Sequence, residues 1–259
     1  MSTPMNNSLP WPTEAPVLPV LSVRPVLDRI DSLARTHEQD VTLIPGLAMT
    51  EEEVAADPPP ALEQVADELG GIELCGQRVL TLQIEDRTDV GPYTLLGEAT
   101  SFYPLYETPD AAVILTIDPD GAPGAVYGIG EDLALYLAAP NLGGYLERFA
   151  DALEATLNAL AERDDEGEAR TEAAEQLMEG HLFAEILGMD ETADPVEVPL
   201  QAPATTDIVE LPGHAVAVAD LREAPRGARV DLIDADVPGD PLDLHVIWRE
   251  RGRIVVLAG

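Results

Sequence analysis

The segment from residue 112 to residue 149 reads AVILTIDPDGAPGAVYGIGEDLALYLAAPNLGGYLERF and carries the clearest structural signals of the chain. Its first six residues, 112–117, form a continuous apolar run rich in β-branched side chains, which is typical of a strand. The Asp-Pro-Asp-Gly sequence at 118–121 has the composition of a turn. Residues 125–129 and 133–138 predict two more strands, joined by a short polar turn at 130–132. Short strands separated by tight polar turns predict an antiparallel meander.

A long helix is predicted directly after these strands. Asn141 is a natural N-cap, because its side chain can accept a hydrogen bond from a backbone N–H of the first turn. The apolar residues that follow recur at helical spacing. They are Leu142, Tyr145, Leu146, Phe149, Leu153, Leu157 and Leu160. A charged run at 162–168 interrupts this pattern, and a second helix is predicted from about Thr171 to Leu187.

Upstream of the quoted segment, the pattern predicts two shorter helices and one strand. The first helix runs from Val26 to about His37, with one apolar stripe. The second begins near Pro60, which suits a first helical turn, and ends at Gly70-Gly71, where a left-handed cap is expected. Alternating apolar residues at 80–84 then predict a strand.

Downstream, the pattern is again that of strands. Arg251-Gly252 lies between the last two of them and suits a hairpin turn. The predicted strands are 208–211, 215–221, 230–233, 244–248 and 254–257.

The expected fold class is α+β, a mostly antiparallel sheet flanked by helices, with a helical segment and a C-terminal β-rich extension. We expect four parts in the chain. They are a flexible Pro-rich lead-in at 1–20, an α+β domain at 21–165, an acidic helix and linker at 166–206, and a β-rich segment at 207–259.

The charge of the chain excludes several classes of partner. There are 49 acidic and 14 basic residues among 259, all of the basic ones are arginine, and the net charge is −35. A nucleic acid or an anionic membrane would be repelled, whereas a cationic partner would be attracted. Fifteen of the acids lie in residues 151–200, against two arginines. Much of the excess therefore lies outside the strands of the predicted meander.

The sequence predicts a cytoplasmic protein. Cys75 is the only cysteine, so no disulfide can form within the chain. Residues 1–20 contain five prolines and no basic residue, which is not the layout of a signal peptide. No apolar run approaches the roughly 18 residues that a transmembrane helix needs.

No catalytic, cofactor-binding or metal-binding residue is predicted. Asp118-Pro119-Asp120-Gly121 could open a calcium loop, but Ile129 occupies the position where such a loop needs a bidentate acid. The four histidines are widely spaced, and no nucleophile elbow is present. A phosphate-binding loop of the Walker type needs a lysine, which the chain lacks. Cys75 is expected to be a small core residue.

Acidic residues at the predicted strand ends suggest a binding surface. If they share one rim, they would steer a cationic protein partner toward it. Tyr127 is either a core ring or an exposed contact residue. The candidate partner-binding residues are Glu107, Asp110, Asp118, Asp120, Tyr127, Glu131 and Asp132.

The order of these elements resembles the SUKH superfamily (Smi1/Knr4-like) over residues 45–160. Residues 60–71 are similar to that family's helix ending in Asn-Gly-Gly, with Leu69 in place of the asparagine. Residues 118–127 are similar to its Asp-rich strand pair, and 138–146 to the start of its last helix. The resemblance implies an α+β domain without catalysis, often an immunity protein that binds and blocks a toxin.

These observations lead to three hypotheses for function. The first is a bacterial immunity protein that binds and neutralises a cognate toxin, which would be basic. The second is a regulatory or scaffold protein of the Smi1/Knr4 type. The third is an enzyme that uses scattered carboxylates, for which no recognisable constellation of residues is present. The sequence does not specify the oligomeric state.

Overall fold

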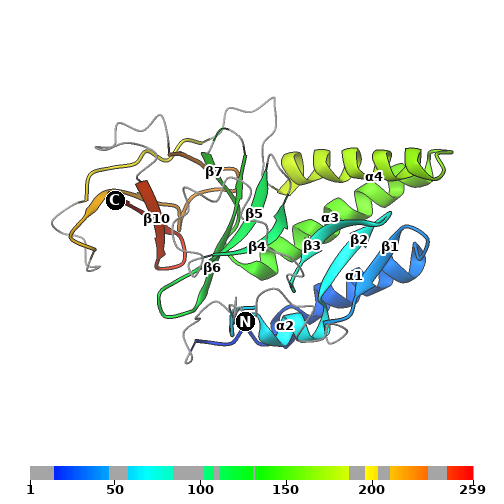
Figure 1. Ribbon diagram of the computed structural model, residues 1–259, viewed down its shortest axis with the longest axis horizontal. Coiled ribbons are helices and arrows are strands. Elements are labelled where there is room, and N and C mark those ends of the chain that lie inside the picture. The colour runs from blue at the N-terminus through cyan, green and yellow to red at the C-terminus, as the bar shows by residue number, and fades with distance from the viewer. Residues whose placement is uncertain are drawn as a thin grey trace, which may run out of the picture.

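A computed structural model describes residues 15–46, 58–83, 102–107, 111–130, 132, 134–186, 196–203, 211–232 and 244–258. This part of the chain folds into three antiparallel sheets with helices packed beside them, so the predicted α+β class is confirmed (Figure 1). The helices are η1 (Val20–Ser22), α1 (Arg24–Thr36), α2 (Glu63–Glu68), α3 (Leu142–Ala161) and α4 (Glu168–His181), followed by a π-helical turn, η4 (Leu182–Ile186).

The central sheet has the order β4-β5-β6-β7-β9. Its strands are β4 (Phe102–Glu107), β5 (Ala112–Ile117), β6 (Pro123–Ile129), β7 (Ala134–Ala139) and β9 (Arg229–Asp231). The predicted meander is therefore confirmed as β5, β6 and β7, each antiparallel to the next. The last strand comes from the C-terminal part of the chain, where Val230 pairs with Leu135 of β7.

Both faces of the central sheet are buried, and this explains the uninterrupted apolar run in β5. Val113 and Leu115 point into a core shared with α1, α3 and α4. Ile114, between them, points into a second core on the opposite face, together with Tyr127 and Trp248. Because successive side chains of a strand alternate between the faces, a strand covered on both sides must be apolar at every position.

The second sheet has the order β1-β2-β3 and packs against the helical side. Its strands are β1 (Val41–Ile44), β2 (Gly71–Leu74) and β3 (Gln77–Thr81). Only β3 overlaps a predicted strand, and it shares residues 80 and 81 with the one expected at 80–84, whose last residue lies outside the described residues. The apolar residues of β1 and β2 are too few for a clear alternating pattern, and tertiary packing decides their conformation.

The predicted left-handed cap at Gly70-Gly71 is wrong. Neither glycine has a positive φ; α2 ends at Glu68 and Gly71 is the first residue of β2. A Cβ on Gly71 would lie 2.7 Å from the carbonyl oxygen of Leu80 on the paired strand, and one on Gly70 would lie 3.2 Å from the carbonyl oxygen of Pro45. The glycines are needed here because neighbouring backbone approaches closely.

The third sheet, β10-β11-β8, lies against the opposite face of the central sheet (Figure 1). Its strands are β8 (Ala215–Asp220), β10 (Leu244–Arg249) and β11 (Arg253–Ala258). The hairpin turn predicted at Arg251-Gly252 is confirmed, with Arg249 paired to Arg253 across it. Glu250 and Arg251 both have positive φ in this turn, at 49° and 61°.

Residues 15–20, which the sequence analysis assigns to the lead-in, pack on the folded chain. Ala15 is buried, and the backbone N–H of Leu18 donates a 2.9 Å hydrogen bond to the carbonyl oxygen of Ala61. The predicted helix at 26–37 is confirmed as α1, which follows directly. The described segment 15–23 therefore packs on the surface beside α2 and α3.

Candidate functional site

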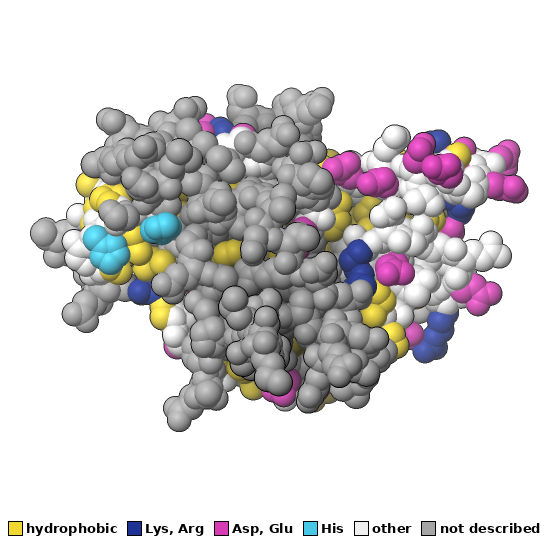
Figure 2. Space-filling model, in the orientation of Figure 1, with side chains coloured by type: hydrophobic (Ala, Val, Ile, Leu, Met, Phe, Trp, Pro, Cys, Tyr) yellow, Lys and Arg dark blue, Asp and Glu magenta, His cyan; other side chains and the backbone are white. Residues whose placement is uncertain are grey.

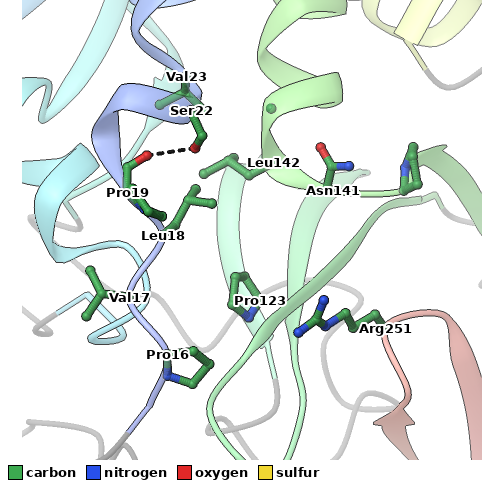
Figure 3. Close-up of a pocket in the computed structure, with 12 residues that line it drawn as sticks. Pro16, Val17, Leu18, Pro19, Ser22, Val23, Pro123, Asn141, Leu142 and Arg251 are labelled. Atoms are coloured by element: carbon green, nitrogen blue, oxygen red, sulfur yellow. Dashed lines mark hydrogen bonds between the residues drawn. The ribbon is translucent and has the colours of Figure 1, made fainter.

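A cavity of about 460 Å³ lies where three distant parts of the chain meet (Figure 3). One wall is the segment from Pro16 to Val23. The second is the start of α3, at residues 140–143, with Pro123 of β6 beside it. The third is Arg251, from the turn between β10 and β11. A volume of this size is within the range of small-ligand and side-chain binding pockets.

Hydrogen bonds fix the N-terminal wall. The Ser22 hydroxyl donates a 2.7 Å bond to the carbonyl oxygen of Pro19, which closes the turn before α1 (Figure 3). The backbone N–H of Val20 donates to Oε1 of Gln64 at 3.3 Å. Together with the bond from Leu18 to Ala61, these contacts attach the wall to α2 and the residues before it.

The start of α3 is organised by Asn141. Its side-chain oxygen accepts a 2.9 Å hydrogen bond from the backbone N–H of Gly144, which confirms the predicted N-cap. Leu142 and Gly143, in the first turn, have no hydrogen-bond acceptor for their N–H groups among the described residues. The first turn also lacks an acidic residue, although acids are favoured at that end of a helix.

Arg251 is held in place through its backbone. Its N–H donates a 3.0 Å hydrogen bond to Oδ2 of Asp118, in the turn between β5 and β6. A Cβ on Gly124 would lie only 3.4 Å from the Arg251 Cα, so the hairpin sits close against β6. The guanidinium extends toward Pro123, and no described carboxylate pairs with it (Figure 3).

Asp118 is buried, with 9% of its surface exposed. Burial raises the pKa of its carboxyl above the usual value, and the hydrogen bond from the Arg251 backbone partly opposes this shift. The second oxygen, Oδ1, has no hydrogen-bond partner among the described residues. Asp118 therefore connects the central sheet to the C-terminal hairpin and is not a surface residue.

The cavity differs in charge from the rest of the protein. None of the described residues that line it is acidic, although the chain has 49 acids. A second cavity, of about 310 Å³, is lined by Asp28, Asp31 and Glu68, among others. A third, of about 210 Å³, is lined by Glu107 and Glu175. Only the first of these three combines apolar walls with an arginine that has no carboxylate partner among the described residues.

One group of exposed acids lies at the other end of α3. Figure 2 shows acidic side chains along the α4 side of the molecule. Because α3 has 20 residues, its C-terminal end lies about 30 Å from the cavity. The exposed acids around the connection to α4 are Glu162, Asp164, Glu166, Glu168, Glu172 and Glu175.

The predicted acidic rim is wrong, because the described candidates lie at opposite ends of the central sheet. Glu107 pairs with Ala112 at the start of β5, at the same end as Asp132. Asp118 and Asp120 follow β5 at the other end. A strand of six residues separates the two ends by about 17–20 Å. Asp110 and Glu131 lie outside the described residues.

Tyr127 is a core residue and not an exposed contact residue. It is fully buried, and its ring stacks on Trp248 with centroids 5.2 Å apart. The contact joins the central sheet to the C-terminal sheet. Its hydroxyl has no hydrogen-bond partner among the described residues.

Asp132 has a structural contact of its own. It accepts a 2.7 Å hydrogen bond from the Tyr136 hydroxyl and lies 3.4 Å from the guanidinium of Arg229. Arg229 also pairs with Asp231 at 3.0 Å. This network fixes the edge of the central sheet where β9 joins β7.

Cys75 lies at the turn between β2 and β3 and is half-buried. Its thiol is 3.6 Å from Oδ1 of Asp40, and burial together with this carboxylate raises the pKa of the thiol. Such a thiol is a poor nucleophile at neutral pH. In the described part of the chain, no three His, Cys, Asp or Glu side chains are grouped closely enough to hold a metal ion.

No sequence pattern predicts the cavity, although two of the residues that line it lie in predicted features. Asn141 was expected as a helix cap and Arg251 as a turn residue, but nothing in their spacing shows that they converge. The one available signal was the absence of acids from 140–146, in a chain that is acidic elsewhere.

Comparisons with family models, curated proteins and solved structures find no match to this chain. Among the described helices, none is both long and apolar enough to cross a membrane.

Proposed function

We propose that this chain is a non-enzymatic binding module that recognises another protein. The observation that carries the proposal is the apolar segment beside the cavity. Val17 is 39% exposed and Leu21 is 77% exposed, and both lie in the same short stretch, 17–21. Large apolar side chains exposed together beside a cavity are typical of a surface that a partner covers.

The partner proposed here is a toxin, which the module would bind and block as an immunity protein. The role is the one that the SUKH resemblance of residues 45–160 implies. The charge supports a basic partner. With a net charge of −35 and exposed acids around the connection between α3 and α4, the protein would attract a cationic molecule over a long range.

Coexpression with the toxin-like product of a neighbouring gene tests this proposal. We expect growth protection and a complex that copurifies. Its association rate should fall as the salt concentration rises above about 0.15 M, where the Debye length is about 8 Å. No protection and no complex would contradict the proposal. If the module gives no growth protection but captures housekeeping proteins, a regulatory scaffold would be favoured.

A matched pair of variants tests whether the apolar segment makes the contact. Leu21→Asp places a charge beside the cavity, and we expect it to weaken the complex at least tenfold. Val196→Asp is the control, because Val196 is also an exposed large apolar residue, at 54%, but lies outside the 15–23 segment. Equal effects of the two substitutions would show that the segment is not the contact.

A further inference from the structure

The cavity at the start of α3 has mostly apolar walls and is lined by Arg251, whose guanidinium forms no salt bridge among the described residues. Several other arginines among the described residues are paired with carboxylates, as Arg222 is with Asp220 and Glu250. Arg251 forms no such salt bridge among the described residues, although it is attracted by the nearby Asp118 carboxylate, and none of the described residues that line the cavity is acidic. A ligand that places a negative charge beside Arg251 would complete a charge-assisted pair.

The remaining walls define the rest of the ligand. Val17, Leu18 and Leu142 line the cavity together with prolines, and Figure 3 shows Leu18 and Leu142 side by side. Aliphatic and proline side chains favour an apolar group of matching shape. The ligand should therefore combine an aliphatic group with an anion.

The exposed residues outside the cavity distinguish a protein from a small molecule. A small ligand enclosed in about 460 Å³ would leave Leu21 uncovered, since it is not one of the residues that line the cavity. A partner protein would cover Leu21 and insert a group into the cavity at the same time. The exposed apolar segment thus favours a polypeptide.

The overall charge restricts which part of a polypeptide can enter. A protein with net charge −35 repels an acidic partner and attracts a basic one. Every polypeptide with a free C-terminus carries one carboxylate there, however basic it is. A chain end can therefore satisfy Arg251 without making the partner acidic.

We infer that the cavity binds the C-terminal end of the partner, with the terminal carboxylate paired to Arg251 and an aliphatic last residue packed against Val17, Leu18 and Leu142. This inference rests on the proposed protein-binding function and specifies its chemistry. The N–H groups of Leu142 and Gly143 have no acceptor among the described residues, and the first turn of α3 contains no acid, which is compatible with an anion nearby.

Peptide titrations followed by NMR test the inference directly on the full chain. The probe is acetyl-Ala-Leu-Leu with a free C-terminal carboxylate, and its comparison is the same peptide with a C-terminal amide. We expect the carboxylate peptide to shift the amide signals of Leu142, Gly143 and Arg251 and to bind at least tenfold more tightly than the amide. Equal binding of the two peptides would overturn the inference.

A third peptide, acetyl-Leu-Glu-Leu amide, separates a chain end from an internal acidic residue. Its single negative charge is on the glutamate side chain and not at the C-terminus, and we expect it to bind more weakly than the carboxylate peptide. Tighter binding of this peptide would overturn the assignment to a chain end.

Two arginine substitutions complete the test. Arg251→Gln should weaken the carboxylate peptide about tenfold and leave the amide peptide unchanged. Arg35→Gln removes the same charge from an exposed position at the far end of α1 and should change the affinity for neither peptide.

If Arg251→Gln leaves the affinity for an identified toxin unchanged, the inference fails while the proposed function stands. If no toxin binds, the proposed function fails, whatever the peptides show.

Discussion

The carboxylate of Asp118 accepts a 3.0 Å hydrogen bond from the backbone N–H of Arg251, a residue 133 positions later in the chain. This contact joins the turn between β5 and β6 to the turn between β10 and β11. It fixes the backbone position of Arg251, so that its side chain lies beside Pro123 and lines the cavity. A buried acid in a turn of the central sheet thus positions a cation in a turn of the C-terminal sheet.

Removing that acceptor should destabilise the protein. Asp118→Ala leaves the Arg251 N–H without its partner, and we expect a loss of about 1–3 kcal/mol in the free energy of unfolding. Urea unfolding at pH 7 measures it. Asp118→Asn is the matched control, because its amide oxygen can accept the same hydrogen bond. A loss in Asp118→Asn as large as in Asp118→Ala would contradict the role given to this bond.

The pH dependence of the Asn variant gives a second result. Burial raises the pKa of Asp118, so the charged carboxylate costs stability at neutral pH, and the cost disappears as the pH falls through the raised pKa. As the pH falls from 7 into the range where carboxyl groups titrate, the wild type should therefore gain stability relative to Asp118→Asn. A relative loss on acidification would mean that the pKa is lowered.

The ion pair between Asp40 and Arg170 should stabilise the helical side in the opposite pH direction. The guanidinium donates two hydrogen bonds to the carboxylate, at 2.7 and 2.8 Å, and links α4 to the residue before β1. These bonds hold the pKa of Asp40 below its usual value. The stabilisation is present above the unfolded-state pKa of about 3.9 and is lost as the pH falls through the lower folded value.

Arg170→Gln is therefore expected to cost about 1–3 kcal/mol at pH 7, because Asp40 is only 10% exposed and loses its partner. The difference from wild type should shrink below about pH 4. Arg35→Gln is the control, since the Arg35–Asp31 pair is exposed and should contribute less than about 1 kcal/mol. Urea unfolding at pH 7 and pH 3 measures both. Equal losses in the two variants at pH 7 would contradict the argument.

The environment of Tyr127 shows what local sequence patterns cannot predict. The apolar run of β5 and the cap at Asn141 follow from local composition, and both are confirmed. Whether Tyr127 faces solvent depends on the C-terminal sheet, which packs on it through Trp248 from more than 100 residues away. A strand pattern gives the alternation of side chains but not what covers each face.

The same limit applies to the acidic candidates and to the cavity. Glu107 and Asp118 are both at strand ends, and composition marks strand ends well. Which end of the sheet each occupies depends on how many strands separate them, and β4 was not predicted. The convergence of Pro16, Asn141 and Arg251 depends on three connections across the fold, none of which leaves a local pattern.

Two substitutions at Tyr127 test its place in the core. Tyr127→Phe should leave stability unchanged or slightly raised, because the hydroxyl has no hydrogen-bond partner among the described residues. Tyr127→Ala should cost about 3–5 kcal/mol, since it creates a cavity beneath Trp248. Urea unfolding measures both, and binding of the partner should be retained by Tyr127→Phe. A loss above about 1 kcal/mol in that variant would show that the hydroxyl is bonded.

Arg229 should decide whether β9 stays attached to the central sheet. Its side chain is 20% exposed and pairs with Asp231 at 3.0 Å and with Asp132 at 3.4 Å. It also lies over the ring of Tyr136, 5.8 Å from the centroid. Arg229→Gln removes these contacts and leaves two carboxylates close together. We expect a loss of about 1–3 kcal/mol.

A second substitution, Asp231→Asn, tests whether the loss of stability in Arg229→Gln comes from the pair between Arg229 and Asp231. In a double-mutant cycle, Asp231→Asn should cost less in the Arg229→Gln background than in the wild type, because the pair is already broken. Hydrogen exchange should show faster opening of Val230 and Leu135, which pair across β9 and β7, while Val126 and Leu115 in the sheet centre keep their protection. Additive losses, or uniform exchange across the sheet, would mean that Arg229 stabilises the protein elsewhere than at this strand pair.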